Sequence, residues 1–153
     1  MKPHVAPGWV LVLLLCAGPA SAQPEPKIKV VPLLETVTTL TGQKLEYPGK
    51  NPQVTATIAE IPPGAVVGWH EHPNLRYVFV IDGTLTIEME NGTRRDFPAG
   101  TIFVEALRTR HRGMNAGTSP AKVLFIDHSE AGQSNMIKSE PSGSGPNGDK
   151  GEH

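Results

Sequence analysis

The sequence predicts an all-β domain of the jelly-roll type, a double-stranded β-helix closed into a barrel. Apolar and polar residues alternate over residues 84–90, as in a strand with one face toward a core and the other toward solvent. Asn91 and Gly92 follow directly and are expected to supply the positive φ angles of a tight hairpin. Short apolar segments separated by such turns recur with no helical period, which is typical of a sandwich or barrel.

The elements expected in chain order are strands rich in Val, Ile, Thr and Phe. The strongest cover residues 53–61, 77–81, 84–90, 101–105 and 121–127, with Pro-Pro-Gly, Asp-Gly, Pro-Ala-Gly and Asn-Ala-Gly turns among them. Residues 28–34 and 36–45 are expected to add edge strands that close the sheet or pair with a second subunit. Such pairing matters because an exposed strand edge promotes uncontrolled association.

The first 22 residues have the pattern of a secretory signal peptide. Lys2 precedes an apolar run at residues 10–15, and the small residues 20–22 fit cleavage before Gln23. The run is shorter than the ~20 residues of a membrane span. The single cysteine, Cys16, does not follow the small residue that a lipoprotein signal needs. We therefore expect an exported protein, periplasmic or secreted, with no membrane anchor in its mature form.

The remainder divides into a barrel domain at residues 23–128, with its motif-bearing core at 54–128, and a tail at 129–153. The tail is rich in Ser, Gly, Pro and charged residues, so it buries too little apolar surface to offset the entropy of ordering. We expect it to be disordered, although its large apolar residues, Met136 and Ile137, can lie across the barrel wall. A formal net charge of −1 gives no case for nucleic-acid binding, so small molecules are the expected partners.

Three histidines are the candidate metal ligands. His70 and His72 are two residues apart in an extended segment, so their imidazoles point to the same face. His111 lies one further strand pair along the chain and would supply a third nitrogen. Glu71 points to the opposite face and is a poor candidate for the same metal. Without Cys16 the mature chain has no thiol, which leaves His, Asp and Glu as ligand types.

The segment that runs from Gly64 through His70 and His72 to Gly83 resembles the first motif of the cupin family. That motif has a Gly, five residues, His-x-His, a Glu and a second Gly. Every position fits except the Glu, whose place is taken by Arg76. With a second motif downstream, the resemblance extends over about residues 54–128. Two motifs in order are far more specific than a lone His-x-His.

Five downstream positions compare with the family's second motif: Gly100, His111 and Asn115 match it, whereas Ala106 and Arg108 replace its Pro and Gly. A competing alignment uses Gly92 with residues 98–100, but it puts Phe103 in the place of the histidine. We prefer the first alignment because it retains the residue with metal chemistry. Asn115 is then expected to fix the loop that carries His111 by bonding to its backbone.

The resemblance implies that His70, His72 and His111 bind a divalent transition metal, one of Fe, Mn, Ni, Cu or Zn. Arg76 has no lone pair to offer a cation, so the family's fourth ligand is lost or replaced. Glu105, just before the His111 loop, is the candidate substitute. Two orientations of Arg76 stay open: inward, where its planar fork binds an anionic substrate group, or outward to solvent.

The expected function is a small exported metal-dependent enzyme, a dioxygenase-type oxidoreductase whose substrate and oxygen take the open positions of a three-His site. Two alternatives stay open because a fold does not select a function. One is a non-catalytic module that binds a small molecule or metal. The other is a metal-free, isomerase-like barrel whose histidines act as general acid and base. The resemblance to small cupins also implies a homodimer.

Overall fold

The computed structural model describes residues 28–139, which contain strands, turns and loops but no helix. In chain order the strands are β1 (Pro52–Ile61), β2 (His70–Glu71), β3 (Arg76–Asp82), β4 (Thr84–Met89), β5 (Arg94–Pro98), β6 (Ile102–Val104), β7 (His111–Met114), β8 (Ala121–Glu130) and β9 (Ile137–Lys138). The five strongest predicted strands correspond to β1, β3, β4, β6 and β8 and are confirmed. No helix in the described residues is long and apolar enough to cross a membrane.

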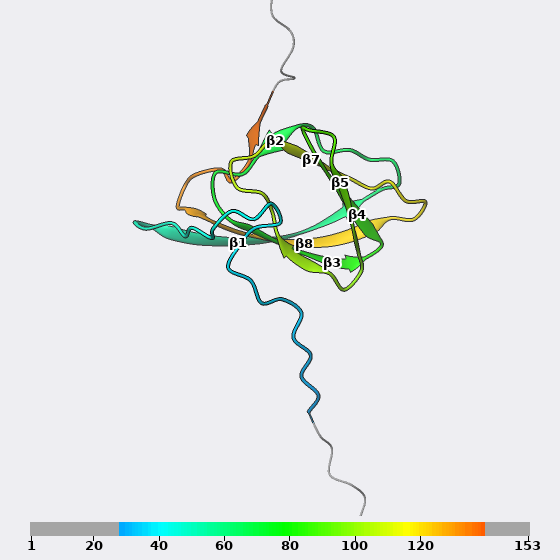
Figure 1. Cartoon of the computed structure of the whole chain (residues 1–153), viewed down its shortest axis with the longest axis horizontal. Helices are drawn as coiled ribbons and strands as arrows, with labels where there is room; N and C mark the ends of the chain where they lie inside the picture. The colour runs from blue at the N-terminus through cyan, green and yellow to red at the C-terminus, as the bar shows by residue number, and fades with distance from the viewer. Residues whose placement is uncertain (1–27, 140–153) are drawn as a thin grey trace, which may run out of the picture. The chain divides into compact units, whose positions relative to one another are not determined.

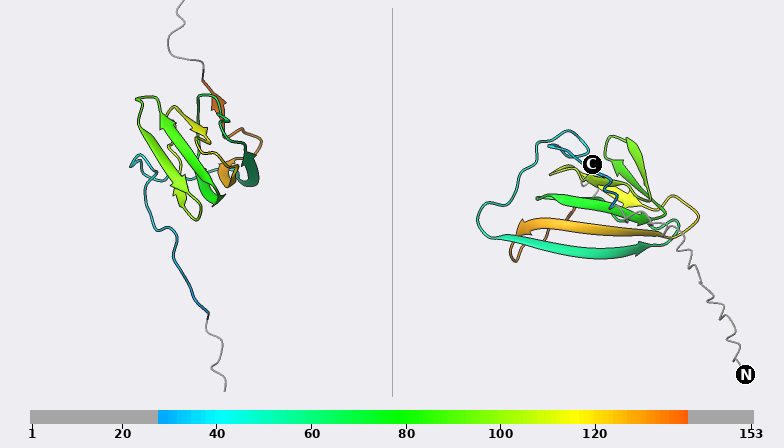
Figure 2. Two further views of the ribbon diagram at one scale, coloured as in Figure 1. Left: turned by 90° about the vertical axis from the view of Figure 1, so that its right-hand side faces the viewer. Right: turned by 90° about the horizontal axis from the view of Figure 1, so that it is seen from below.

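The strands form two antiparallel sheets that face each other (Figure 1). One sheet has the order β1-β8-β3-β6, and the other has the order β5-β4-β7-β2-β9. Figure 2 shows β1, β8 and β3 side by side as the long strands of the first sheet. The predicted all-β jelly-roll barrel is confirmed, and the space between the sheets is where inward-facing side chains meet.

The hydrophobic core lies between the sheets and draws on both of them. Phe97 of β5 stacks on Phe103 of β6 with ring centroids 3.7 Å apart, which joins the two sheets. The apolar positions of β4 are buried, as the alternation predicts. Its outward Glu88 is buried as well, because Arg112 of β7 bonds to it. The buried core consists of Ile61, Val78, Val80, Leu85, Ile87, Met89, Phe97, Phe103, Ala106, Ala121 and Val123.

Six glycines in the described residues have positive φ, and three of them occupy glycine positions of the two aligned motifs. Gly64, Gly83 and Gly100 have φ angles of 75°, 73° and 83°, a region that side chains other than hydrogen rarely enter. At Gly83, a Cβ atom would also lie 2.7 Å from the carbonyl oxygen of Pro120. Any larger residue there would displace the backbone of this turn or the start of β8, because Ala121 lies about equally close.

The residues before β1 differ from the prediction. Within the chain, residues 28–34 form no strand, and residues 36–45 form only one isolated bridge, between Thr38 and Lys44. Pro32 lacks the N–H that a ladder needs. The second segment is held by one backbone bond, from the Leu40 N–H to the Val104 carbonyl, and by Gln43, whose side chain bonds both the N–H and the carbonyl of Leu107. The two segments therefore do not add the predicted edge strands to this sheet.

The C-terminal boundary also differs. The sequence places the end of the barrel at residue 128, but β8 continues to Glu130, and β9 pairs with β2. We call residues 132–139 the strap. It is ordered because Asn135 is buried and its side chain bonds to Asn74, Leu75 and Asp127. The predicted signal peptide at 1–22 and the rest of the predicted tail, residues 140–153, lie outside the described part of the chain.

Candidate metal centre

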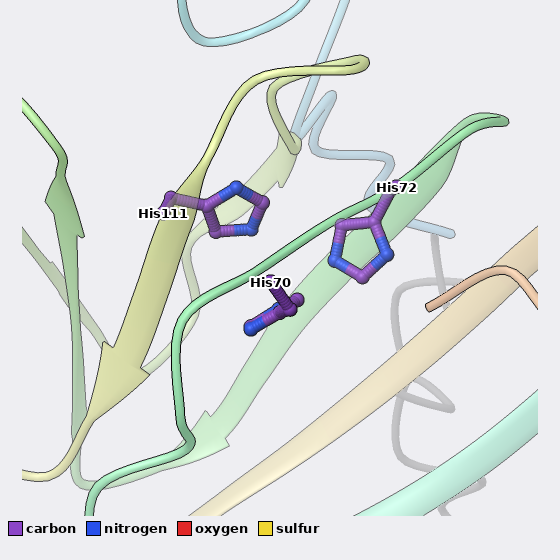
Figure 3. A group of neighbouring side chains, drawn as sticks. All are labelled: His70, His72 and His111. Atoms are coloured by element: carbon purple, nitrogen blue, oxygen red, sulfur yellow. The ribbon is translucent and has the colours of Figure 1, made fainter. Parts of the chain in front are cut away.

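The three histidines come together at the second sheet. His70 of β2 and His111 of β7 are direct partners across the antiparallel ladder. His72 follows β2 and is held by a bridge to Leu107. Figure 3 shows the three rings gathered at one point, and their centroids lie 4.6 to 5.1 Å apart. All three side chains are buried, with relative exposures of 3 % or less.

Each imidazole is oriented through its Nδ1 atom by a backbone carbonyl. The acceptors for His70, His72 and His111 are the carbonyl oxygens of Gly68, Asn135 and Thr109, at 2.7, 2.5 and 2.7 Å. A carbonyl can only accept, so Nδ1 carries the proton and the neutral ring presents a lone pair at Nε2. This is the arrangement that orients metal-binding histidines in proteins. For two of the rings the carbonyl lies two residues earlier, so the local backbone sets the orientation.

Glu105 lies against the free side of this cluster. Its Oε2 atom is 2.9 Å from His72 Nε2, and its Oε1 atom is 3.7 Å from His111 Nε2. Among the described residues, His72 Nε2, His111 Nε2 and Glu105 Oε2 are buried without a hydrogen-bond partner. With Nδ1 protonated, these are lone pairs facing lone pairs, which is unfavourable in a dry interior unless a cation lies between them.

A metal ion fits this donor set. One ligand nitrogen from each histidine lies within 4.8 Å of the others, and ligands that share one ion at bonds of ~2.1 Å are separated by about 4.2 Å or less. Small side-chain rotations would therefore bring them into range. Three imidazoles and one carboxylate suit Zn, Fe, Mn, Ni or Cu rather than Ca or Mg, which prefer oxygen ligands.

The ionisation of these groups also suits a cation. Burial lowers the pKa of His70 to about 4, so the ring is neutral at physiological pH. Burial alone would raise the pKa of Glu105, but His111 and His72 beside it hold the pKa well below its usual range. Burial acts to lower the pKa of His111, whereas Glu105 raises it above its usual value. Glu105 thus favours a positive charge beside His111, which a metal ion bound here would supply.

Arg76 faces inward and is neutralised by a residue that the sequence analysis did not single out. Its Nε and Nη2 atoms donate to the two carboxylate oxygens of Asp127, its cross-strand partner on β8, at 2.7 and 2.9 Å. Its guanidinium lies 5.0 Å from the ring centroid of Phe125 and its Nε lies 3.9 Å from Glu105. The bidentate pair compensates the cation that stands in the motif's Glu position.

The space beside the cluster is a small cavity of about 110 Å³. Its polar lining is His70, Arg76 and Glu105, and the rest is apolar: Ala59, Ile61, Val67, Leu85, Ile87, Gly113, Phe125 and Met136. A few convergent polar groups in an apolar cavity are typical of a small-molecule site. The small volume restricts the ligands that fit beside the cluster to small molecules.

Comparisons with known proteins agree with this fold. Residues 57–127 match a family model described as Cupin domain. Among solved structures, the chain is similar to the DMSP lyase DddQ from Ruegeria pomeroyi DSS-3, with a TM-score of 0.50 and 19% identity over 59% of this chain and 45% of that chain. The barrel has the cupin fold. This chain spans less than half the length of that lyase.

Other solved structures are similar at lower TM-scores. An oxalate decarboxylase from Lactobacillus farciminis aligns with a TM-score of 0.48 and 23% identity, over 56% of this chain and 26% of that chain. A cupin-2 domain containing protein from Shewanella frigidimarina aligns with a TM-score of 0.42 and 22% identity, over 48% of this chain and 68% of that chain. No curated protein matches the chain in sequence.

The loop before His111 has a positive φ at the position that the sequence comparison aligns with the second motif's Gly. Arg108, in the Gly position, has a φ of 48° and is the one non-glycine residue with positive φ in the described chain. Its N–H donates to the carbonyl of His72. Asn115 is buried and its side chain donates to the carbonyls of Ile61 and Ser119, so it ties the end of β7 to the neighbouring turns.

The sequence did not single out two residues that support the site, Asp127 and Asn135. Asp127 shares the face of Ala121 and Val123, which are buried, so strand alternation could have placed it inside. Asn135 lies in the segment expected to be disordered, and no periodicity marks it. Its carbonyl orients His72, which is a backbone role that residue type does not reveal.

Proposed function

We propose that this cupin domain binds a divalent transition metal through His70, His72 and His111, with Glu105 as a fourth ligand. We further propose that it is an oxygen-dependent oxidoreductase of the dioxygenase type, acting on a small molecule held beside the metal. The observation that carries the proposal is the convergence of three Nε2 lone pairs and one carboxylate with no proton donor between them. When bound, a metal such as iron would supply Lewis-acid and oxygen chemistry at its open positions.

The chain's own residues have distinct roles in this proposal. The carbonyls on the three Nδ1 atoms hold the rings in one tautomer, which keeps Nε2 free. Glu105 contributes the negative charge that a divalent ion needs. The apolar cavity wall excludes water from the reacting space. Arg76, although paired with Asp127, lines the cavity and can donate from Nη1 to an anionic group of the substrate.

The first test is metal content, with a matched control. The parent chain, His70→Ala/His72→Ala and His128→Ala are loaded anaerobically with Fe(II), freed of excess metal and analysed for iron. His128 lies outside the cluster, against Tyr47 and Tyr77. We expect about one iron per chain in the parent and in His128→Ala, and nearly none in the double variant. Equal iron in all three would contradict the proposed site.

The second test asks whether the metal has an open position. Nitric oxide, which binds ferrous iron where dioxygen would, is added to the loaded parent and followed by electron paramagnetic resonance. An iron–nitrosyl signal supports an oxygen-dependent enzyme. Bound iron without that signal contradicts it and favours the alternative of a non-catalytic binding module. The small cavity volume is the observation that supports this alternative.

Two further parts of the proposal concern compartment and assembly. The N-terminal sequence supports export, periplasmic or secreted, with cleavage before Gln23. Mass spectrometry of the exported chain tests this, and an intact N-terminus on the exported protein would contradict it. The exposed apolar side chains Val54 and Ile58 on the edge strand β1 support a homodimer. Light scattering of the purified chain would show twice the chain mass if this is correct.

A further inference from the structure

A second pocket adjoins the cavity beside the histidines. This outer pocket has a volume of about 240 Å³ and is lined by polar residues of β1, β3, β8 and the strap: Thr55, Arg76, Asp127, Ser129, Gln133, Ser134 and Asn135, together with Met136. The inner cavity and the outer pocket share two lining residues, Arg76 and Met136. These two side chains therefore form the partition between the outer pocket and the metal centre.

The two halves of the partition differ in how firmly they are held. Arg76 makes two charge-assisted hydrogen bonds to Asp127 and lies over the ring of Phe125, so moving it would break a buried ion pair. Met136 is half-buried, and its hydrogen bonds with the Ser134 hydroxyl are made by its backbone, not by its thioether. An unbranched methionine changes rotamer readily and adapts to irregular spaces. Met136 is thus the half of the partition that can move.

The backbone of the strap is fixed on both sides of Met136. Before it, the Asn135 side chain bonds to Asn74, Leu75 and Asp127, and its carbonyl accepts from His72. After it, β9 pairs with β2. Lifting the strap would break these bonds and release the ring of His72. Access by rotation of one side chain costs far less than access by strap opening.

We propose that Met136 is the specificity-determining residue of the metal centre. Ligands reach the histidines from the polar outer pocket by displacing the Met136 side chain, and its bulk restricts the site to small oxygen-donor molecules such as short carboxylates. This inference rests on the proposed metal centre. It predicts that shortening Met136 joins the two pockets and admits larger ligands, while the histidines and their orientation stay unchanged.

The test uses the Co(II)-loaded full chain, whose visible absorbance reports each ligand that binds the metal. Acetate and benzoate carry the same carboxylate head, but benzoate adds a ring that has to pass Met136 to reach the metal. We compare the parent with Met136→Ala, the volume-conserving Met136→Leu and Ile137→Ala. Ile137 is the next strap residue and is 48% exposed, so its replacement controls for disturbance of the strap. A fifth chain, Met136→Phe, enlarges the partition.

We expect benzoate to bind Met136→Ala about tenfold or more tightly than the parent, a discrimination typical of steric exclusion from a pocket. The affinity of Met136→Ala for acetate should stay within about threefold of the parent's. Met136→Leu and Ile137→Ala should bind both ligands as the parent does. Met136→Phe should slow the association of acetate. A chain that binds Co(II) and acetate but gains no benzoate affinity in Met136→Ala overturns this inference alone. A chain that takes up no Co(II) overturns the metal centre and this inference with it.

Discussion

Replacing Asp127 with Asn removes the charge partner of Arg76 without changing the size of the side chain. Asp127 accepts three hydrogen bonds, two from Arg76 and one from Asn135. An amide has one oxygen and one NH₂ group, so at least one of these donors would face another donor. The guanidinium would stay in the barrel with its charge uncompensated.

The size of the effect follows from burial and distance. Both side chains are 11% exposed, and their closest atoms are 2.7 Å apart. Opposite unit charges at about 4 Å attract by about 4 kcal/mol at an effective dielectric constant of ~20. Removing one partner of such a buried pair costs about 3–5 kcal/mol. That is a large part of the ~5–15 kcal/mol by which a domain of this size is stable.

The assay is equilibrium unfolding in urea, followed by circular dichroism, on metal-free chains. Asp127→Asn should have a much lower unfolding midpoint than the parent. Arg76→Met/Asp127→Asn should recover most of the loss, because removing both charges is far less costly than stranding one. In Asp127→Asn the released Arg76 should also turn to Glu105, 3.9 Å away in the parent, and weaken metal binding.

A single variant within about 1 kcal/mol of the parent would refute this reasoning, since that is the range of an exposed ion pair. A double variant no more stable than Asp127→Asn would also refute it. In that case the loss would come from the Asn135 hydrogen bond rather than from the stranded charge.

Three further predictions follow from other parts of the structure. Glu105→Gln should lower Zn(II) affinity about 100-fold or more in a chelator competition. Loss of a residue that only contacts a metal ligand already lowers metal affinity by about 10–100-fold. An affinity within about threefold of the parent would show that Glu105 is no ligand. Arg108→Gly should be about 1 kcal/mol more stable to urea than Arg108→Ala, because only glycine adopts a φ of 48° freely. Both variants lose the same ion pair to Glu46, so its loss cancels in the comparison. Equal unfolding midpoints would contradict backbone strain at this position. Burial, and then the hydrogen bond with Tyr47, raise the pKa of Tyr77 to about 12 from 10.0. The stability of the folded state should therefore fall as pH rises between these values, because the phenol ionises first in the unfolded chain. Ultraviolet titration should show a lower Tyr77 pKa in Tyr47→Phe, and an unchanged pKa would contradict this cause.

Much of the fold follows from the sequence because its signals are local. Alternation placed β4 and the pair His70 and His72, and turn residues marked the ends of the strands. The same alternation carries Arg76 inward with Val78 and Val80, although the sequence alone left its orientation open. A buried arginine is acceptable only with a counter-charge, and that partner, Asp127, lies 51 residues away along the chain.

The strap could not be predicted for a different reason. Its composition has little apolar surface, and composition alone predicts disorder. It is ordered by contacts that need the barrel to exist first: the edge of β2 for β9, and the groups around Asp127 for Asn135. For the segments before β1 the difference has the opposite sense, since the sequence predicts edge strands that this sheet does not contain. Their β-branched residues favour strands, yet the second is anchored by the Gln43 side chain rather than by a ladder.

The central claim is that three histidines hold one metal ion, and X-ray absorption spectroscopy of the Zn(II)-loaded chain tests it most directly. Multiple scattering counts imidazole ligands and distinguishes them from oxygen donors. We predict three imidazoles with at least one oxygen ligand in the parent, and two imidazoles in a His111→Ala chain that still retains metal. A spectrum with one imidazole or none in the parent, or one unchanged by His111→Ala, would contradict the proposed metal centre.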